Sequence, residues 1–121
     1  MLYEETEKKE IERVYAVFAD YIRESPYLEW FWSDKLGYLL LKIGAEKRYI
    51  AKNVIIYTAE QVARILFSEV SMDVLRMTGN DHTEQTADPL ELAEIKRRWN
   101  PYIDQLPEYA YLCDELLSRR K

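Results

Sequence analysis

The sequence lacks the cysteine pairs, glycosylation sites and long apolar runs that would place it outside the cytoplasm. Its single cysteine, Cys113, cannot form an internal disulfide, and no Asn-x-Ser/Thr acceptor occurs, which together favour a reducing compartment. No apolar stretch approaches the roughly eighteen residues of a membrane-spanning helix. Residues 1–13 are crowded with Glu and Lys where a signal peptide would have an apolar core. We therefore expect a cytoplasmic protein that is not bound to a membrane.

Glycine is also scarce, and the three glycines stand alone at positions 37, 44 and 79. Dinucleotide-binding fingerprints and phosphate-binding loops need grouped glycines, because the backbone must approach a phosphate closely. The sequence has neither motif, and it has no nucleophile elbow, kinase signature or paired-cysteine zinc spacing. Cys113 lies on a predicted apolar helical stripe, where an inert buried thiol is the common case. These absences favour a protein without catalytic activity, and we expect no cofactor.

What the chain has in excess is aromatic surface. It contains ten Tyr and three Trp among 121 residues, with 48% hydrophobic and 32% charged residues. This composition predicts one folded domain over residues 1–121 instead of a disordered chain. Tyr and Trp favour sites with one dry and one wet side, and protein interfaces are such sites. The formal net charge of -5 disfavours nucleic acid and anionic membranes as partners.

The clearest structural signal is a short β-branched run, residues 54–57, that leads directly into a long amphipathic helix. Thr58 can cap this helix, Gln61 can return a hydrogen bond to the Thr58 N–H, and Gly79 can close the helix in the left-handed conformation. We therefore predict a central helix over residues 59–78. Its main apolar arc contains Ala59, Val62, Ala63, Leu66, Phe67, Val70, Val74 and Met77.

The chain before the central helix predicts one further helix and a small sheet. The helix should run from Leu2 to Glu24 and end at Ser25-Pro26, since the residue before a proline leaves the α region. Extended segments follow at residues 28–33, at 38–43 and somewhere in 48–57, separated by turn signals. They predict a three-stranded antiparallel meander.

The chain after the central helix predicts two or three more helices. Asp88 should cap the first of them with Pro89 in its first turn, and Pro101 and Pro107 should each start a new helical segment. The expected fold class is α+β. A small meander over about residues 28–57 should pack with an N-terminal helix, a long central helix and the C-terminal helices.

Both faces of the predicted sheet are apolar. Tyr38 and Leu40 alternate with other apolar residues, and Trp30 and Trp32 alternate with Phe31. One helical layer can cover one sheet face, so a partner is expected on the other. We predict Trp30, Trp32, Tyr38 and Leu40 as interface residues. A second copy in isologous two-fold pairing, or another protein, is the expected partner.

Asp73 does not fit the apolar arc of the central helix, and Glu69 lies one turn before it. Two carboxylates at i and i+4 repel, and burial would raise the pKa of Asp73, as in general acids and metal sites. One hypothesis is therefore a metal-dependent or acid/base site built on Glu69 and Asp73. The interpretation that we favour is structural: Asp73 accepts a hydrogen bond from a core Tyr or pairs with an Arg across a helix interface.

The loop before residue 88 offers a second metal candidate. Asp81, His82, Glu84 and Asp88 supply donors that could hold Mg²⁺ or Ca²⁺, and His82 and Glu84 have the H-x-E spacing of zinc deaminases. The cysteine ligands of that chemistry are missing, and the spacing fits no EF-hand. A solvated acidic loop is the simpler interpretation.

Lys96, Arg97 and Arg98 form a basic cluster beside Trp99 that could bind phosphate and stack on bases. On a helix, however, these three side chains diverge by more than about 90°, and neighbouring acids offer ion partners. Nucleic acid is therefore disfavoured as a partner, while a regulator that mimics nucleic acid stays open. No feature defines a small-molecule ligand. Our principal hypothesis is a small, non-enzymatic interaction or accessory protein that forms a homodimer.

Overall fold

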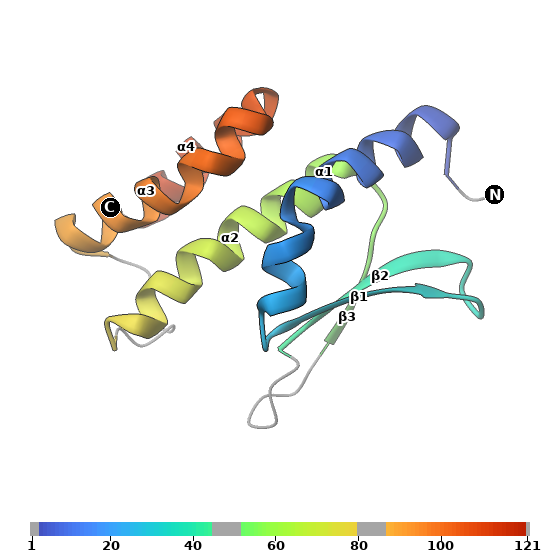
Figure 1. Ribbon diagram of the computed structural model, residues 1–121, viewed down its shortest axis with the longest axis horizontal. Helices are drawn as coiled ribbons and strands as arrows, with labels where there is room; N and C mark the ends of the chain where they lie inside the picture. The colour runs from blue at the N-terminus through green and yellow to red at the C-terminus, as the bar shows by residue number, and fades with distance from the viewer. Residues whose placement is uncertain (1–2, 45–51, 80–86, 121) are drawn as a thin grey trace. The chain divides into compact units, whose positions relative to one another are not determined.

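The computed structural model describes residues 3–44, 52–79 and 87–120, and it has the predicted α+β architecture (Figure 1). The chain divides into two compact units, Met1–Val62 and Ala63–Lys121, which we call the N-terminal and C-terminal units. A single domain over residues 1–121 stays a prediction. The elements are α1 (Glu5–Glu24), β1 (Leu28–Ser33), β2 (Tyr38–Ile43), β3 (Lys52–Ile55), α2 (Ala59–Met77), α3 (Pro89–Gln105), the 3₁₀ turn η1 (Pro107–Tyr109) and α4 (Ala110–Arg120).

The sheet is the predicted antiparallel meander with the strand order β1-β2-β3. The first two strands have the predicted bounds, and the third lies inside the predicted window. Gly37 closes the β1–β2 turn with a φ of 70°, a left-handed conformation that glycine adopts without strain. The Gly37 N–H donates to the Ser33 carbonyl at 2.7 Å, and the Leu36 N–H donates to the Ser33 hydroxyl at 3.2 Å. Local turn chemistry therefore sets the hairpin register.

The two faces of the sheet differ in what covers them. Leu28, Trp30 and Trp32 share one face, and their cross-strand partners on β2 lie on the same face. Helix α1 packs on this face, with the Tyr15 ring stacked on Trp30 at a centroid distance of 4.8 Å. The opposite face carries the ion pair of Glu29 with Lys42 at 3.5 Å. The buried stripe of α1 is Ile11, Val14, Phe18 and Ile22.

A tyrosine hydroxyl is inserted where the β2–β3 ladder ends. The Ile56 N–H donates to the Leu39 carbonyl at 2.9 Å, as the register predicts. The reciprocal bond is replaced by the Tyr3 hydroxyl, which accepts from the Leu39 N–H at 3.0 Å and donates to the Ile56 carbonyl at 2.5 Å. Burial raises the pKa of the Tyr3 phenol, so the proton that it donates is retained. The start of the chain is thereby fixed to the end of the sheet.

The predicted cap of α2 is confirmed. The Gln61 N–H donates to the Thr58 hydroxyl at 3.1 Å, and the Gln61 amide oxygen accepts from the Thr58 N–H at 3.4 Å. A second cap comes from α1, because the Glu7 carboxylate accepts from the Ala59 N–H at 2.8 Å. Negative charge at a helix N-terminus is favourable. The predicted apolar arc is buried apart from Met77, which is 66% exposed in the last turn.

The C-terminal unit confirms one predicted helix start and corrects another. Asp88 and Glu91 form a reciprocal capping box at the start of α3, with bonds of 2.8 and 3.0 Å. Pro101, however, does not start a new segment but lies inside α3. Its missing N–H removes one helical bond on the exposed side of the helix, while the buried Trp99 holds the helix on its other side. Pro107 does begin a segment, the turn η1 that leads into α4.

Candidate functional site

A hollow in the described part of the N-terminal unit lies between the first half of α1 and the sheet. It has a volume of about 430 Å³, which falls within the range of about 300 to 1,000 Å³ for ligand pockets. Trp32 at its edge is 48% exposed. We call this hollow the aromatic pocket. Its lining residues are Tyr3, Lys8, Glu12, Tyr15, Trp30, Trp32 and Leu39.

A second hollow, of about 290 Å³, lies further along β1 and also borders the second half of α1. Tyr15 and Trp30 line both hollows. Their stacked rings lie nearly parallel, with an interplanar angle of 25°. The stacked pair therefore borders two hollows along the same edge strand. The second hollow is lined by Tyr15, Ala19, Ile22, Arg23, Leu28, Glu29 and Trp30.

The backbone of β1 is open along its outer edge. The Leu39 carbonyl accepts from the N–H of Ile56, the residue that follows β3. The backbone groups of Leu39 therefore point toward β3 and away from β1. Alternation then directs the backbone groups of Leu40 toward β1, where its partner is Phe31. The backbone groups of Glu29, Phe31 and Ser33 face β2, so the outward-facing residues of β1 are Leu28, Trp30 and Trp32. Their N–H and C=O groups face the outer edge, where no described residue pairs with them.

The charged residues of the aromatic pocket come from one helix face. Lys8 and Glu12 are one turn apart on α1, so opposite charges lie near each other at the pocket. The hydroxyl of Tyr3 is already engaged by Leu39 and Ile56. Tyr3 therefore presents its ring to the pocket as an apolar wall.

The structure separates the four predicted interface residues. Trp30 and Trp32 line the aromatic pocket, whereas Tyr38 and Leu40 lie on the other sheet face. Leu40 is only 4% exposed, and the Tyr38 ring meets the rings of Tyr3 and Tyr57 edge to face at 5.5 Å. The four residues therefore do not form one continuous surface.

Sequence reasoning missed five residues of the aromatic pocket. Tyr15 was available as a signal, since it shares the apolar arc of the first helix while many of its neighbours are charged. Tyr3 shares that arc, and Leu39 belongs to an apolar face of the predicted sheet, whereas Lys8 and Glu12 carried no local signal because their proximity to the sheet depends on how α1 crosses it. These five residues are Tyr3, Lys8, Glu12, Tyr15 and Leu39.

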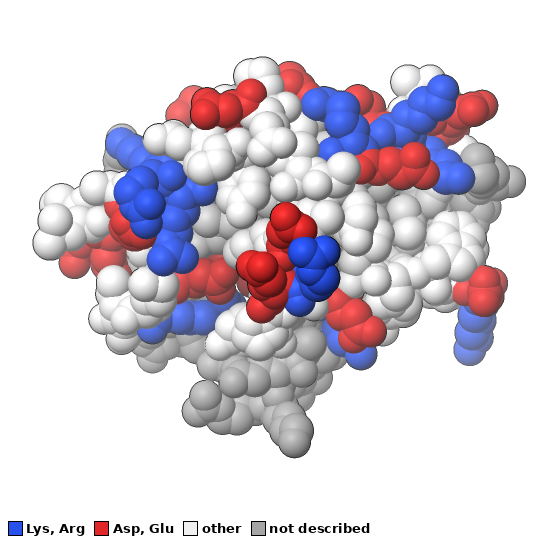
Figure 2. Space-filling view, viewed as in Figure 1, with Lys and Arg blue, Asp and Glu red and all other residues white. Residues whose placement is uncertain are grey.

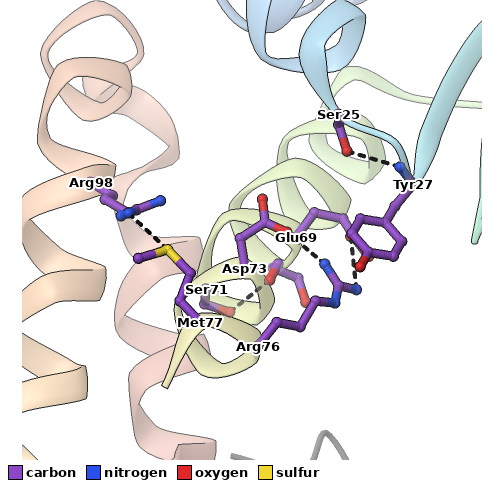
Figure 3. Close-up of polar contacts among 9 residues, drawn as sticks. Ser25, Tyr27, Glu69, Ser71, Asp73, Arg76, Met77 and Arg98 are labelled. Carbon is purple, nitrogen blue, oxygen red and sulfur yellow. Dashed lines mark hydrogen bonds and ion pairs between the residues drawn. The ribbon is translucent and has the colours of Figure 1, made fainter. Parts of the chain in front are cut away.

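Glu69 and Asp73, the predicted acid pair, lie one turn apart on α2, and Arg76 of the same helix contacts both (Figure 3). Arg76 donates to the Asp73 carboxylate at 2.6 Å and lies 3.6 Å from Glu69 Oε2. The more buried acid is Glu69, whose side chain is 11% exposed against 24% for Asp73. Burial raises the pKa of Glu69, and the charge of Arg76 partly opposes that effect. Asp73 thus pairs with an arginine, but with one on its own helix. Two carboxylates that share one arginine are typical of a structural ion-pair cluster.

The predicted metal loop cannot be compared with the structure, because Asp81, His82 and Glu84 lie outside the described residues. Within residues 3–44, 52–79 and 87–120, no group of three or more acidic, histidine or cysteine side chains is placed to hold a metal ion. Cys113 is buried on α4, and this burial raises the pKa of its thiol to about 12. A thiol with that pKa is a poor nucleophile near neutral pH.

The predicted nucleic-acid residues Lys96, Arg97 and Arg98 follow one another on α3. Two of them are engaged by Glu94, whose carboxylate accepts from Arg97 at 2.5 Å and from Arg98 at 2.9 Å. Their hydrogen bonds lower the pKa of Glu94 to about 2. Figure 2 shows basic and acidic side chains next to one another on the face in view. Arg97 and Arg98 are thus paired with an acid, whereas nucleic-acid-binding surfaces typically gather basic side chains on one face.

No protein-family model, curated protein or solved structure matches this chain. Among the helices of the described ranges, none is long and apolar enough to cross a bilayer.

Proposed function

We propose that the protein is a non-catalytic interaction protein whose working form is a homodimer joined along β1. The observation that carries this proposal is the open outer edge of β1, at Leu28, Trp30 and Trp32. An unpaired strand edge readily accepts another strand, and edges that stay unpaired are commonly protected by Lys or Pro. The sequence of β1, Leu-Glu-Trp-Phe-Trp-Ser, contains neither.

The sequence of β1 fits pairing with a second copy of itself. An antiparallel pair with its two-fold axis perpendicular to the sheet keeps the Trp30 and Trp32 side chains of both copies on one face. With Trp30 opposite its own equivalent, Leu28 lies opposite Trp32, so each outward-facing residue gains a partner. Glu29 then lies opposite Phe31, and like charges do not face each other across the new pair.

The test uses two substitutions at one position. Trp32→Pro removes an outward-facing N–H, and proline is tolerated where the N–H of an edge strand faces solvent. Trp32→Ala removes the indole but keeps that N–H. Size-exclusion chromatography with light scattering should give a dimer for the unchanged protein and for Trp32→Ala, and a monomer for Trp32→Pro.

Two results would overturn the proposal. If the unchanged protein stays monomeric at the highest soluble concentration, it does not self-associate through the β1 edge. A Trp32→Pro protein that stays fully dimeric, with an unchanged circular dichroism spectrum, must associate through another surface.

A further inference from the structure

We infer that the aromatic pocket binds a small, planar aromatic molecule with little net charge. The pocket lies wholly within the N-terminal unit, between α1 and the first two strands. The inference rests on the pocket walls and not on strand pairing, so it does not depend on the proposed homodimer.

The walls indicate the shape of the ligand. Four of the seven lining residues carry aromatic rings: Tyr3, Tyr15, Trp30 and Trp32. Aromatic rings bind one another in offset-stacked or edge-to-face arrangements, which add to the gain from burying apolar area. A flat ring system can meet several of these walls at once, whereas an aliphatic molecule of equal volume gains only the burial term.

The charges indicate that the ligand is close to neutral. Lys8 and Glu12 have opposite signs and lie one helical turn apart. A ligand anion would gain from Lys8 and be repelled by Glu12, and a cation would meet the reverse. The formal net charge of -5 further disfavours anions.

The pocket is held in shape before a ligand arrives. Tyr3 is fixed by its two hydrogen bonds to Leu39 and Ile56, and Glu7, beside Lys8, is fixed by the Ala59 N–H. The Trp30 ring is positioned by its stack on Tyr15. Walls that are ordered in advance reduce the entropy cost of binding.

The test is a nuclear magnetic resonance titration with three probes. Indole is the planar neutral probe, cyclohexanol is the aliphatic control and choline is the cationic control. The three tryptophan side-chain N–H signals act as reporters. Addition of indole should shift the Trp30 and Trp32 signals along a saturable curve. The Trp99 signal should stay in place, because its N–H donates to the Phe67 carbonyl inside the C-terminal unit.

Variants locate the binding within the protein. Trp32→Ala should weaken indole binding at least tenfold, while the Trp30 signal and the circular dichroism spectrum report that the N-terminal unit remains folded. Leu36→Ala is the matched control, because Leu36 is an exposed apolar residue of the same unit that does not line the pocket. Its affinity for indole should be unchanged.

Three outcomes would overturn the inference. Indole could bind no more tightly than cyclohexanol, choline could bind more tightly than indole, or Trp32→Ala could leave indole affinity unchanged. The proposed function fails separately: a monomer that binds indole at Trp30 and Trp32 removes the homodimer and keeps the pocket. A dimer that does not bind indole supports the homodimer and contradicts the inference about the pocket.

Discussion

Trp99 and Trp32 illustrate how differently the two units use the same residue type. Trp99 is 1% exposed, its N–H donates to the Phe67 carbonyl at 2.8 Å, and its ring meets Phe67 edge to face. Trp32 is 48% exposed, and its N–H has no acceptor among the described residues. In the C-terminal unit a tryptophan completes a core. In the N-terminal unit it remains available for contact.

Backbone groups show the same contrast. At the start of α3 in the C-terminal unit, the Asp88 and Glu91 N–H groups each donate to the other residue's carboxylate, and Glu91 also accepts from the Thr78 hydroxyl. In the N-terminal unit, the outer edge of β1 is left without partners in the described chain. The described N-terminal unit therefore leaves polar backbone groups and tryptophan surface without partners, whereas the corresponding groups of the C-terminal unit are bonded or buried.

The strongest test of this contrast compares two tryptophan truncations. Trp99→Ala should lower the free energy of unfolding by about 3 to 5 kcal/mol, since it creates a cavity and removes the hydrogen bond from the indole N–H to the Phe67 carbonyl. Trp32→Ala should cost no more than about 1 kcal/mol, because nearly half of the ring already faces solvent. Urea titration followed by circular dichroism measures both. Equal losses would show that the two units do not differ in this way.

A second test asks how firmly the aromatic pocket is built. Tyr3→Phe keeps the ring but removes the hydroxyl that joins the Leu39 N–H to the Ile56 carbonyl. We expect a loss of about 1 to 3 kcal/mol, because two backbone groups lose their partner. The same urea titration measures it. A loss below the error of the measurement would mean that the Leu39 N–H and the Ile56 carbonyl can bond to each other directly, and that the hydroxyl is not needed for stability.

The smallest expected effect concerns pH and Glu69 in the C-terminal unit. A carboxyl whose pKa is raised on folding contributes stability below its ordinary pKa of 4.5, and that contribution is lost as pH rises through the folded pKa. Glu69→Gln imitates the protonated acid and should not show this loss. Relative to the unchanged protein, the variant should therefore gain on the order of 1 kcal/mol between pH 4 and pH 7.

Unfolding titrations of both proteins at several pH values give this difference directly. Asp73→Asn is the control, since Asp73 is more exposed and bonded to Arg76. A stability difference between Glu69→Gln and the unchanged protein that is the same at pH 4 and pH 7 would contradict the prediction.

The sequence predicted best those features whose causes lie within a few residues. The caps at Thr58 and Asp88 each depend on a partner three residues later, and both are present. Pro101 was wrongly predicted to start a segment because packing around the neighbouring Trp99 overrides the local penalty of a proline. The helical projection placed Asp73 inside the apolar arc but left its burial open, and Glu69 is the more buried of the two acids, since an ideal projection does not show which side chain a neighbour covers.

The candidate site was harder to predict because its parts are far apart in the chain. Trp30 and Trp32 were identified from composition and alternation alone. Tyr3 precedes α1 and Tyr15 lies on it, and their positions at the pocket depend on how α1 crosses the sheet. Periodicity identifies the apolar side of a helix but not the strand residues that it meets. The open edge of β1 likewise required the strand order.

The hydroxyl bridge made by Tyr3 also affects the order of folding. Its partners Leu39 and Ile56 lie 36 and 53 positions further along the chain, so a ribosome delivers Tyr3 long before it delivers the second partner. Contacts of such long sequence separation form late and slow the search for the native state. The Tyr3 bridge can therefore form only after the chain has been synthesised past Ile56, the residue that follows the last strand.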